Sequence, residues 1–200
     1  MVPIILYSDK TRLTVIGGDK SAWPVYMTLG NIEKGHRNQL TFHCWVPIAY
    51  LPVPKWDMDV DELNGILTAR FFHQALSVVM DPLISAAKNG TEMMDSLGDV
   101  RMCYPRIAAY MSDLLEACLN MAITTSRSPV FNITTSQFGD TDPGPLLTYD
   151  VLMDEIEELQ EEYGGDDPTA IAACLKEAKT RGLNGVLHPW WENHVGFEPW

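Results

Sequence analysis

Short apolar runs separated by turn residues dominate the first fifty residues and predict β-strands. The run from Val2 to Leu6 is too short for a helix, so we expect a buried strand that ends by presenting Asp9. Two later runs, Trp23 to Leu29 and Leu40 to Leu51, are rich in β-branched and aromatic residues and predict a second and a third strand. Pro47 cannot donate a ladder hydrogen bond, so it should lie near the sheet edge or at a bulge.

A helical period follows. From Val60 to Lys88 apolar residues recur every three or four positions, which predicts an amphipathic helix that ends at Asn89-Gly90. Val100 to Met111 predicts a fourth strand, with Asp113 just beyond its end. A short helix is expected over Leu114 to Ile123, and the alternative role for Asp113 is that of an N-cap alone, accepting the free amides of the first turn.

The remainder predicts a loop, two helices and an aromatic tail. Thr124 to Pro145 has the composition of an irregular loop, and helices are expected over Asp150 to Tyr163 and Thr169 to Thr180. The acidic face of the first helix is typical of a solvated surface, with a binding surface for cations or basic partners as the alternative. The tail, His188 to Trp200, carries three tryptophans and little chain to bury them, so further sequence or a partner is expected to cover it.

Composition narrows the possible functions. Two hundred residues suit one domain or two small ones, and we expect a core over 1–123 with a helical extension over 124–200. The net charge of −13 repels phosphate backbones overall, although Lys10 to Lys20 and Lys34 to Arg37 are locally basic. The sequence shows neither a secretory signal nor about 18 consecutive apolar residues, which predicts an intracellular protein without membrane contact.

Isolated histidines and cysteines do not predict a metal site. The four cysteines have no C-x-x-C spacing, so neither a zinc site nor a disulfide framework is expected. His73 lies beside the apolar face of the long helix, where a packed histidine is expected more often than a catalytic one.

Several blocks together resemble the front half of Plavaka-type transposases, which are CACTA-like elements of basidiomycete fungi. These blocks are Ile5-Leu6-Tyr7-Ser8-Asp9-Lys10-Thr11, Gly18-Asp19-Lys20-Ser21-Ala22-Trp23-Pro24-Val25-Tyr26, Leu29-Gly30-Asn31-Ile32, Ala49-Tyr50-Leu51-Pro52-Val53, Gly98-Asp99-Val100-Arg101, Pro105-Arg106-Ile107-Ala108-Ala109-Tyr110, Ser128-Pro129-Val130, Gln137-Phe138-Gly139-Asp140, Leu183-Asn184-Gly185-Val186 and Pro189-Trp190-Trp191. Their order makes an accidental match improbable, and they cover nearly the whole chain.

The resemblance implies an α/β fold: an incomplete RNase H-like mixed sheet flanked by helices, with a fourth strand beside the first. In such nucleases one carboxylate ends strand one and another ends strand four, which are the positions of Asp9 and Asp113. Carboxylates suit Mg²⁺ or Mn²⁺, and a pair of such ions can act on a phosphodiester. Asp95 and Asp99 are fallback candidates for the second carboxylate.

The chain also departs from the family pattern. A third acid is normally needed, and in the family it would lie beyond a downstream insertion that follows Trp200. Many relatives carry a C-x-x-C near Ser128-Pro129, which is absent here. After Asp113 an acidic-Tyr-Pro-Glu-Gln pattern is replaced by Leu114-Leu115-Glu116-Ala117, which weakens the assignment of the second carboxylate.

Three hypotheses follow. The first is a truncated or domesticated transposase-derived protein, nuclear and ancestrally DNA-binding, that has lost metal-dependent strand cleavage and transfer. The second is a protein-binding module that uses the acidic helix and the aromatic tail. The third is a gene fragment without a selected function.

Overall fold

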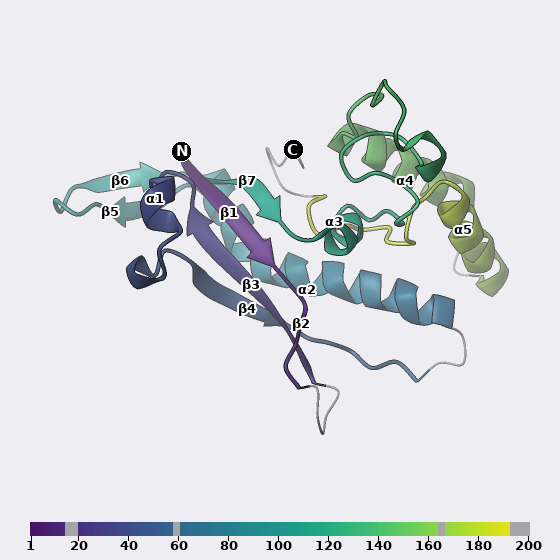
Figure 1. Ribbon diagram of the computed structural model, residues 1–200, viewed down its shortest axis with the longest axis horizontal. Coiled ribbons are helices and arrows are strands. Elements are labelled where there is room, and N and C mark those ends of the chain that lie inside the picture. Colours follow the sequence, from purple (N-terminus) through teal and green to yellow (C-terminus); the bar gives the residue numbers. More distant parts are fainter. Residues whose placement is uncertain (15–19, 58–60, 164–166, 193–200) are drawn as a thin grey trace. The chain divides into compact units, whose positions relative to one another are not determined.

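The computed structural model describes residues 1–14, 20–57, 61–163 and 167–192, and the chain forms two compact units (Figure 1). The first unit contains Met1–Val53 and Ala75–Ser112, and the second contains Pro54–Gln74 and Asp113–Glu192. Helix α2 (Asp61–Asn89) contributes residues to both units. No helix in the described part of the chain is long and apolar enough to span a membrane.

A mixed β-sheet forms the first unit together with the second half of α2. Its main strands are β1 (Val2–Ser8), β3 (Ser21–Leu29), β4 (Val46–Leu51) and β7 (Pro105–Met111). Strand β3 pairs antiparallel with both β1 and β4, whereas β7 pairs parallel with the other side of β1. The expected mixed sheet, with the last strand beside the first, is therefore confirmed.

Strand β1 has two different faces. Ile4, Leu6 and Ser8 are buried, while the residues between them, including Tyr7, are half-buried. The pairing with β7 shifts by one residue between Ile4 and Ile5. Because a one-residue shift exchanges the faces of a strand, this bulge turns Tyr110 toward the buried side, where its hydroxyl lies 2.7 Å from Ser8 Oγ.

The third predicted strand is shorter than expected. Leu40–Phe42 forms a 3₁₀ turn, η1, and only Val46–Leu51 joins the sheet. Pro47 behaves as predicted, since β4 pairs with β3 alone and the register shifts beside Pro47. The basic segment Lys34–Arg37 forms one short helix, α1.

A hairpin interrupts the predicted fourth strand. Thr91–Met94 (β5) pairs with Val100–Cys103 (β6), and only Pro105–Met111 pairs with β1. Gly90, at φ +75°, ends α2 as predicted, and a Cβ there would lie 2.7 Å from Met102 Sδ. Strand β5 gives little sequence signal, because a glutamate and two methionines have weak β propensity.

The second unit is mainly helical. It contains the first half of α2, the helices α3 (Leu114–Asn120), α4 (Tyr149–Tyr163) and α5 (Pro168–Thr180), and the 3₁₀ turn η2 (Thr135–Gln137). Helix α3 ends three residues before the predicted end, and Ala122 then adopts a left-handed φ of 60°. The segment between α3 and α4 is largely irregular, as predicted, and isolated β-bridges such as Phe131↔Leu146 fix it.

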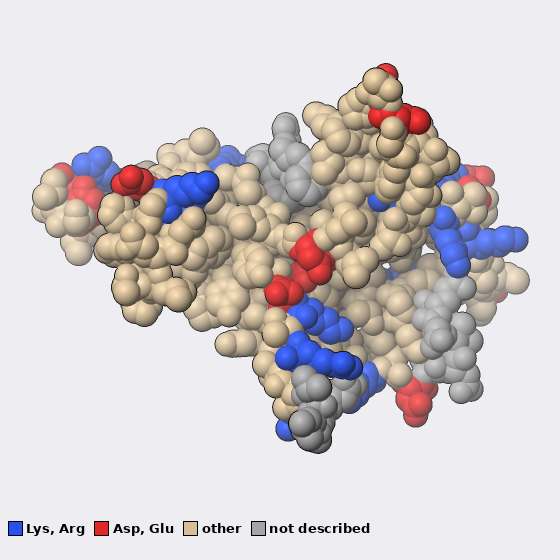
Figure 2. Space-filling model, in the orientation of Figure 1, with Lys and Arg blue, Asp and Glu red and all other residues tan. Residues whose placement is uncertain are grey.

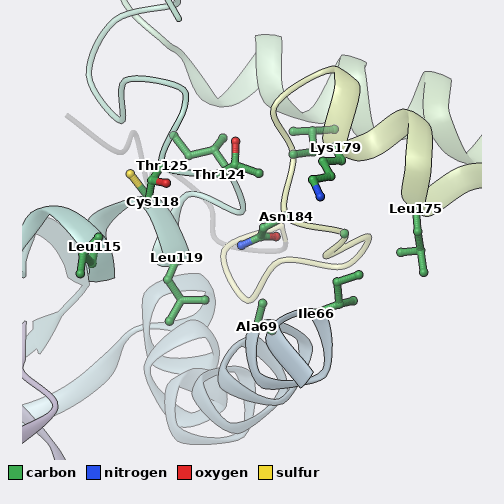
Figure 3. Close-up of a pocket in the computed structure, with 14 residues that line it drawn as sticks. Ile66, Ala69, Leu115, Cys118, Leu119, Thr124, Thr125, Leu175, Lys179 and Asn184 are labelled. Carbon is green, nitrogen blue, oxygen red and sulfur yellow. The ribbon is translucent and has the colours of Figure 1, made fainter. Parts of the chain in front are cut away.

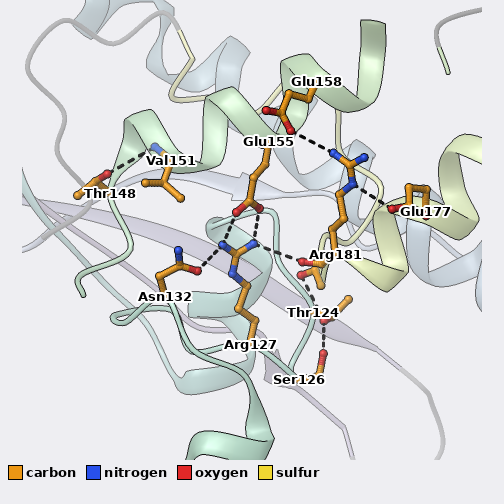
Figure 4. A network of polar contacts seen from close by, with 11 residues as sticks. Thr124, Ser126, Arg127, Asn132, Thr148, Val151, Glu155, Glu158, Glu177 and Arg181 are labelled. Atoms are coloured by element: carbon orange, nitrogen blue, oxygen red, sulfur yellow. Dashed lines mark hydrogen bonds and ion pairs between the residues drawn. The ribbon is translucent and has the colours of Figure 1, made fainter. Parts of the chain in front are cut away.

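One buried arginine holds this irregular segment against α4 (Figure 4). The Arg127 guanidinium, 4% exposed, makes two hydrogen bonds to the Glu155 carboxylate, at 2.5 and 2.8 Å. It also donates to Asn132 Oδ1 at 2.8 Å. A second arginine, Arg181, bonds the carboxylates of α4 and α5, including Glu158 and Glu177. The acidic helix is therefore not wholly a solvated face, because some of its glutamates pair within the unit.

We predict that Glu155→Gln lowers the free energy of unfolding by about 2–4 kcal/mol, because it leaves the buried Arg127 charge without its counter-ion. Glu157→Gln, on the exposed side of the same helix, should change it by less than about 0.5 kcal/mol. Urea unfolding of the two variants beside the parent measures both values. Equal losses in the two variants would show that the Arg127 pair contributes nothing specific.

Candidate functional site

Asp9 lies at the carboxyl end of β1, where the pairing with β3 is interrupted. Ser8 pairs with Val25, and the short strand β2 (Thr11–Arg12) resumes the same register opposite Ala22 and Ser21. In this register Pro24 lies opposite Asp9. The strand pairing is interrupted there because a proline has no N–H group to donate. The Asp9 carboxylate is half-buried and accepts a hydrogen bond from the Tyr7 hydroxyl at 3.4 Å.

Asp113 follows β7 by two residues and begins the second unit. Its Oδ1 accepts a hydrogen bond from the Glu116 backbone N–H at 2.7 Å, so it is the N-cap of α3. The alternative role considered for Asp113 is therefore present in the structure. One carboxylate oxygen satisfies the helix end, and the residue remains a candidate ligand through the other.

The sheet topology brings the ends of β1 and β7 together. Leu6 pairs with Tyr110, and Tyr7 pairs with Met111, in a parallel arrangement. Because parallel strands end at the same edge of a sheet, residues that follow β1 and β7 leave from neighbouring positions. Asp9 and Asp113 are each at most two residues beyond these ends.

The fallback candidates Asp95 and Asp99 belong to a different structure, the turn of the β5–β6 hairpin. Asp95 Oδ1 accepts the backbone N–H groups of Leu97 and Asp99, and Arg101 pairs with both carboxylates at 3.0 and 3.7 Å. The hairpin joins β7 at Pro105, which pairs with Val2 at the amino end of β1. Asp95 and Asp99 therefore lie at the opposite end of the sheet from Asp9.

The carboxylates of Asp9 and Asp113 have the chemistry to bind a hard cation, but two carboxylates are few ligands for one ion. Carboxylate oxygens are the ligands that Mg²⁺ and Mn²⁺ prefer. Within the described ranges, no three or more His, Cys, Asp or Glu side chains are grouped so that they could hold a metal ion. Asp9 and Asp113 could supply two ligands, and the four cysteines are free thiols.

Basic side chains surround the hairpin that follows Asp9. The Lys10 ammonium lies 5.5 Å from the centre of the Trp23 ring, and Arg12 is exposed in β2. Figure 2 shows Lys and Arg gathered beside this hairpin, next to acidic side chains. The strongly acidic chain thus has a local cationic surface near the end of β1.

Two tryptophans of the predicted exposed tail are buried. Trp190 is 2% exposed and Trp191 is 0% exposed. Their indole N–H groups donate to the side-chain and backbone oxygens of Asn120, both at 2.7 Å. The expectation of an uncovered tail is wrong for these residues, because Asn120 of α3 supplies the hydrogen-bond acceptors and the Tyr149 ring of α4 packs edge to face against Trp191. Phe197 to Trp200 lie outside the described residues.

His73 belongs to the same buried cluster and has a structural role, as predicted. It is 1% exposed, with Nε2 2.9 Å from the Leu119 carbonyl and Nδ1 accepting the Trp190 backbone N–H at 3.2 Å. Both contacts are satisfied by the neutral ring protonated at Nε2. Burial lowers the pKa of His73 to about 4, against the smaller opposing effect of the Leu119 hydrogen bond.

The second unit also contains an apolar cavity of about 310 Å³ that the sequence did not indicate (Figure 3). Leu119, Ile66 and Leu183 line it, with Asn184 among the few polar groups. Burial, assisted by the charge of Asp113, raises the pKa of the Cys118 thiol, which lies on its wall. The lining comes from four separated segments, so no local motif could have identified it.

We predict that acid destabilises the protein through His73. Its folded-state pKa, about 4, is below the ordinary value of 6.5, so the unfolded chain binds the extra proton between these values. The contribution of neutral His73 to the free energy of unfolding is therefore fully present above pH 6.5. It falls by about 3 kcal/mol as the pH is lowered toward 4.

Urea unfolding from pH 7 to pH 4 measures this slope. His73→Gln should remove it, whereas His36→Gln, at an exposed position, should leave it intact. NMR titration of the His73 ring in the parent protein gives the pKa directly, and a value near 6.5 would contradict the buried neutral ring.

Comparison with known proteins identifies one family. No curated protein and no solved structure matches the chain. A family model described as Plavaka transposase matches residues 1–199. The match covers both units, including the ends of β1 and β7, and the chain belongs to the Plavaka transposase family.

Proposed function

We propose that this chain is an RNase H-like part of a DNA transposase, in which Asp9 and Asp113 bind Mg²⁺ or Mn²⁺. The observation that carries the proposal is the parallel pairing of β1 with β7. It sets the last strand of the sheet beside the first, and a carboxylate follows each strand end. The β4–β3–β1–β7 order is also the order that the RNase H-like fold requires.

The residues fit binding of a hydrated metal ion. Mg²⁺ commonly retains several waters and uses one or two protein carboxylates. Asp9 is held by Tyr7, and Asp113 is held by the first turn of α3, so neither needs to be recruited from a flexible loop. The bound ion would supply charge neutralisation at a phosphodiester.

The same residues do not support strand cleavage by this chain alone. A two-metal site normally requires a third carboxylate, and the described residues hold no group of three. We therefore propose a transposase-derived protein that binds metal and DNA but does not itself cut DNA. Its DNA contact would use the cationic hairpin around Lys10. It would act in the nucleus.

We predict that Mn²⁺ binds the purified protein and that Asp9→Asn with Asp113→Asn weakens this binding at least tenfold. Asparagine retains the N-cap of α3, so the double variant should keep its stability. Isothermal titration calorimetry measures the affinity, and thermal unfolding confirms the fold.

The control is Asp95→Asn with Asp99→Asn, which removes the same charge from the hairpin turn at the other end of the sheet. It should leave Mn²⁺ affinity unchanged. Loss of binding in this control but not in the Asp9 and Asp113 variant would overturn the proposed assignment.

A further inference from the structure

A second cavity in the first unit has the side chains to hold an unpaired nucleotide. Its volume is about 340 Å³, and Arg37, His43 and Trp45 line it together with the amides of Asn38 and Gln39. It therefore combines a flat aromatic wall with one guanidinium, one imidazole and amide donors. We infer that this cavity, here called the Trp45 pocket, binds one unpaired base of a DNA strand and its phosphate.

Arg37 is fixed in place without a carboxylate. Its Nη1 donates to the carbonyls of Gly30 and Ile32, at 3.3 and 3.4 Å. In the described part of the chain, no carboxylate lies within ion-pair distance of this guanidinium. A guanidinium anchored by neutral carbonyls retains its charge and its planar donors for a phosphate.

The backbone beside the pocket has a conformation that a side chain rarely adopts. His43 follows η1 with φ 48° and ψ 37°, in the left-handed region. Such a conformation costs free energy for a residue other than glycine, and it is commonly kept where a binding site needs the geometry. It leaves His43 exposed on the pocket wall.

Trp45 links the pocket to the end of β1. Its ring contacts Tyr7 edge to face, with centroids 6.3 Å apart, and Tyr7 stacks on Tyr26 at 6.1 Å. The hydroxyl of Tyr7 then donates to Asp9. All of these residues belong to the first unit, so one row of half-buried aromatic rings leads from the pocket to the candidate carboxylate.

Single-stranded DNA fits this surface better than duplex DNA. Aromatic rings bind bases only where the bases are unpaired and exposed, and stacking tolerates any sequence. The net charge of −13 weakens the general attraction for a duplex backbone, whereas Arg37 and Lys10 offer local contacts along one strand. The Trp45 ring contacts Tyr7, and the Tyr7 hydroxyl bonds Asp9, so a 12-nucleotide strand held in the pocket can reach Asp9. This inference rests on the proposed function and extends it, because the strand that the Trp45 pocket holds is the strand that would lie beside the metal site at Asp9.

The test is fluorescence anisotropy with a labelled 12-nucleotide single strand of mixed sequence at low salt. Trp45→Leu and Arg37→Gln should each weaken binding about 5- to 100-fold, the range expected for one lost stacking or charge contact. Trp45→Phe should restore most of the affinity by keeping an aromatic ring. The controls are Phe138→Leu and Lys88→Ala, which remove an exposed aromatic ring and an exposed charge elsewhere.

Competition experiments distinguish three possible ligands of the pocket: a single strand, a duplex and a free mononucleotide. The parent protein should bind the single strand more tightly than the corresponding duplex, and free mononucleotides should compete only weakly. Full competition by a mononucleotide, equal binding of the duplex, or unchanged affinity in both Trp45→Leu and Arg37→Gln would each overturn the inference.

Failure of the pocket and failure of the metal site give different results. Trp45→Leu should weaken oligonucleotide binding and leave the Mn²⁺ affinity unchanged, whereas Asp9→Asn with Asp113→Asn should weaken Mn²⁺ binding and leave the oligonucleotide affinity unchanged. Absence of oligonucleotide binding in the parent, with Mn²⁺ binding intact, would reject the Trp45 pocket alone.

Discussion

The parallel pairing of β1 with β7 is the contact on which the first unit depends. It joins residues about a hundred positions apart, and a parallel pair requires a crossover, which the second half of α2 and the β5–β6 hairpin supply. The bulge after Ile4 sets its register, so that Tyr110 turns inward and reaches Ser8. Without that shift, Tyr110 would face the opposite side of the sheet. The chain beyond β7 would then leave the sheet in a different direction.

The second unit contains two clusters of buried polar side chains that are hydrogen-bonded to one another. His73, Asn120, Trp190 and Trp191 form one buried hydrogen-bonded cluster, and Arg127 with Glu155 forms another. Buried polar groups are costly unless paired, so each cluster specifies one arrangement of its segments. The aromatic residues near the end of the described chain are thus part of this unit's core, which removes the main support for an aromatic docking surface.

Much of the sheet could be predicted from the sequence because its strands are marked by local pattern. Val2 to Leu6, Gly90 and Pro47 each indicated their structure correctly, and α2 followed from its period. The β5–β6 hairpin was missed because Glu92, Met93 and Met94 have weak strand propensity, so that the tertiary context decides. The ends of β1 and β7 could be proposed as neighbours only through the family resemblance.

The side-chain sites were harder to predict for a related reason. Asp9 and Asp113 can be singled out in the sequence because each is an acidic residue just beyond a predicted strand. The burial of Trp190 instead depends on Asn120, seventy residues away in sequence. The Trp45 pocket was indicated only as a basic segment, since its wall requires η1 and the left-handed turn at His43. Sites built from one strand end are visible in a sequence, whereas sites built from several segments require the fold.

The central proposal is that the carboxylates that follow β1 and β7 bind a metal ion. Crystals grown with Mn²⁺ and measured at a wavelength with strong manganese anomalous scattering would test it directly. The account predicts one anomalous peak coordinated by carboxylate oxygens of both Asp9 and Asp113, with Asp113 still capping α3. A peak bound to either residue alone, or a peak at Asp95 and Asp99, would contradict the account.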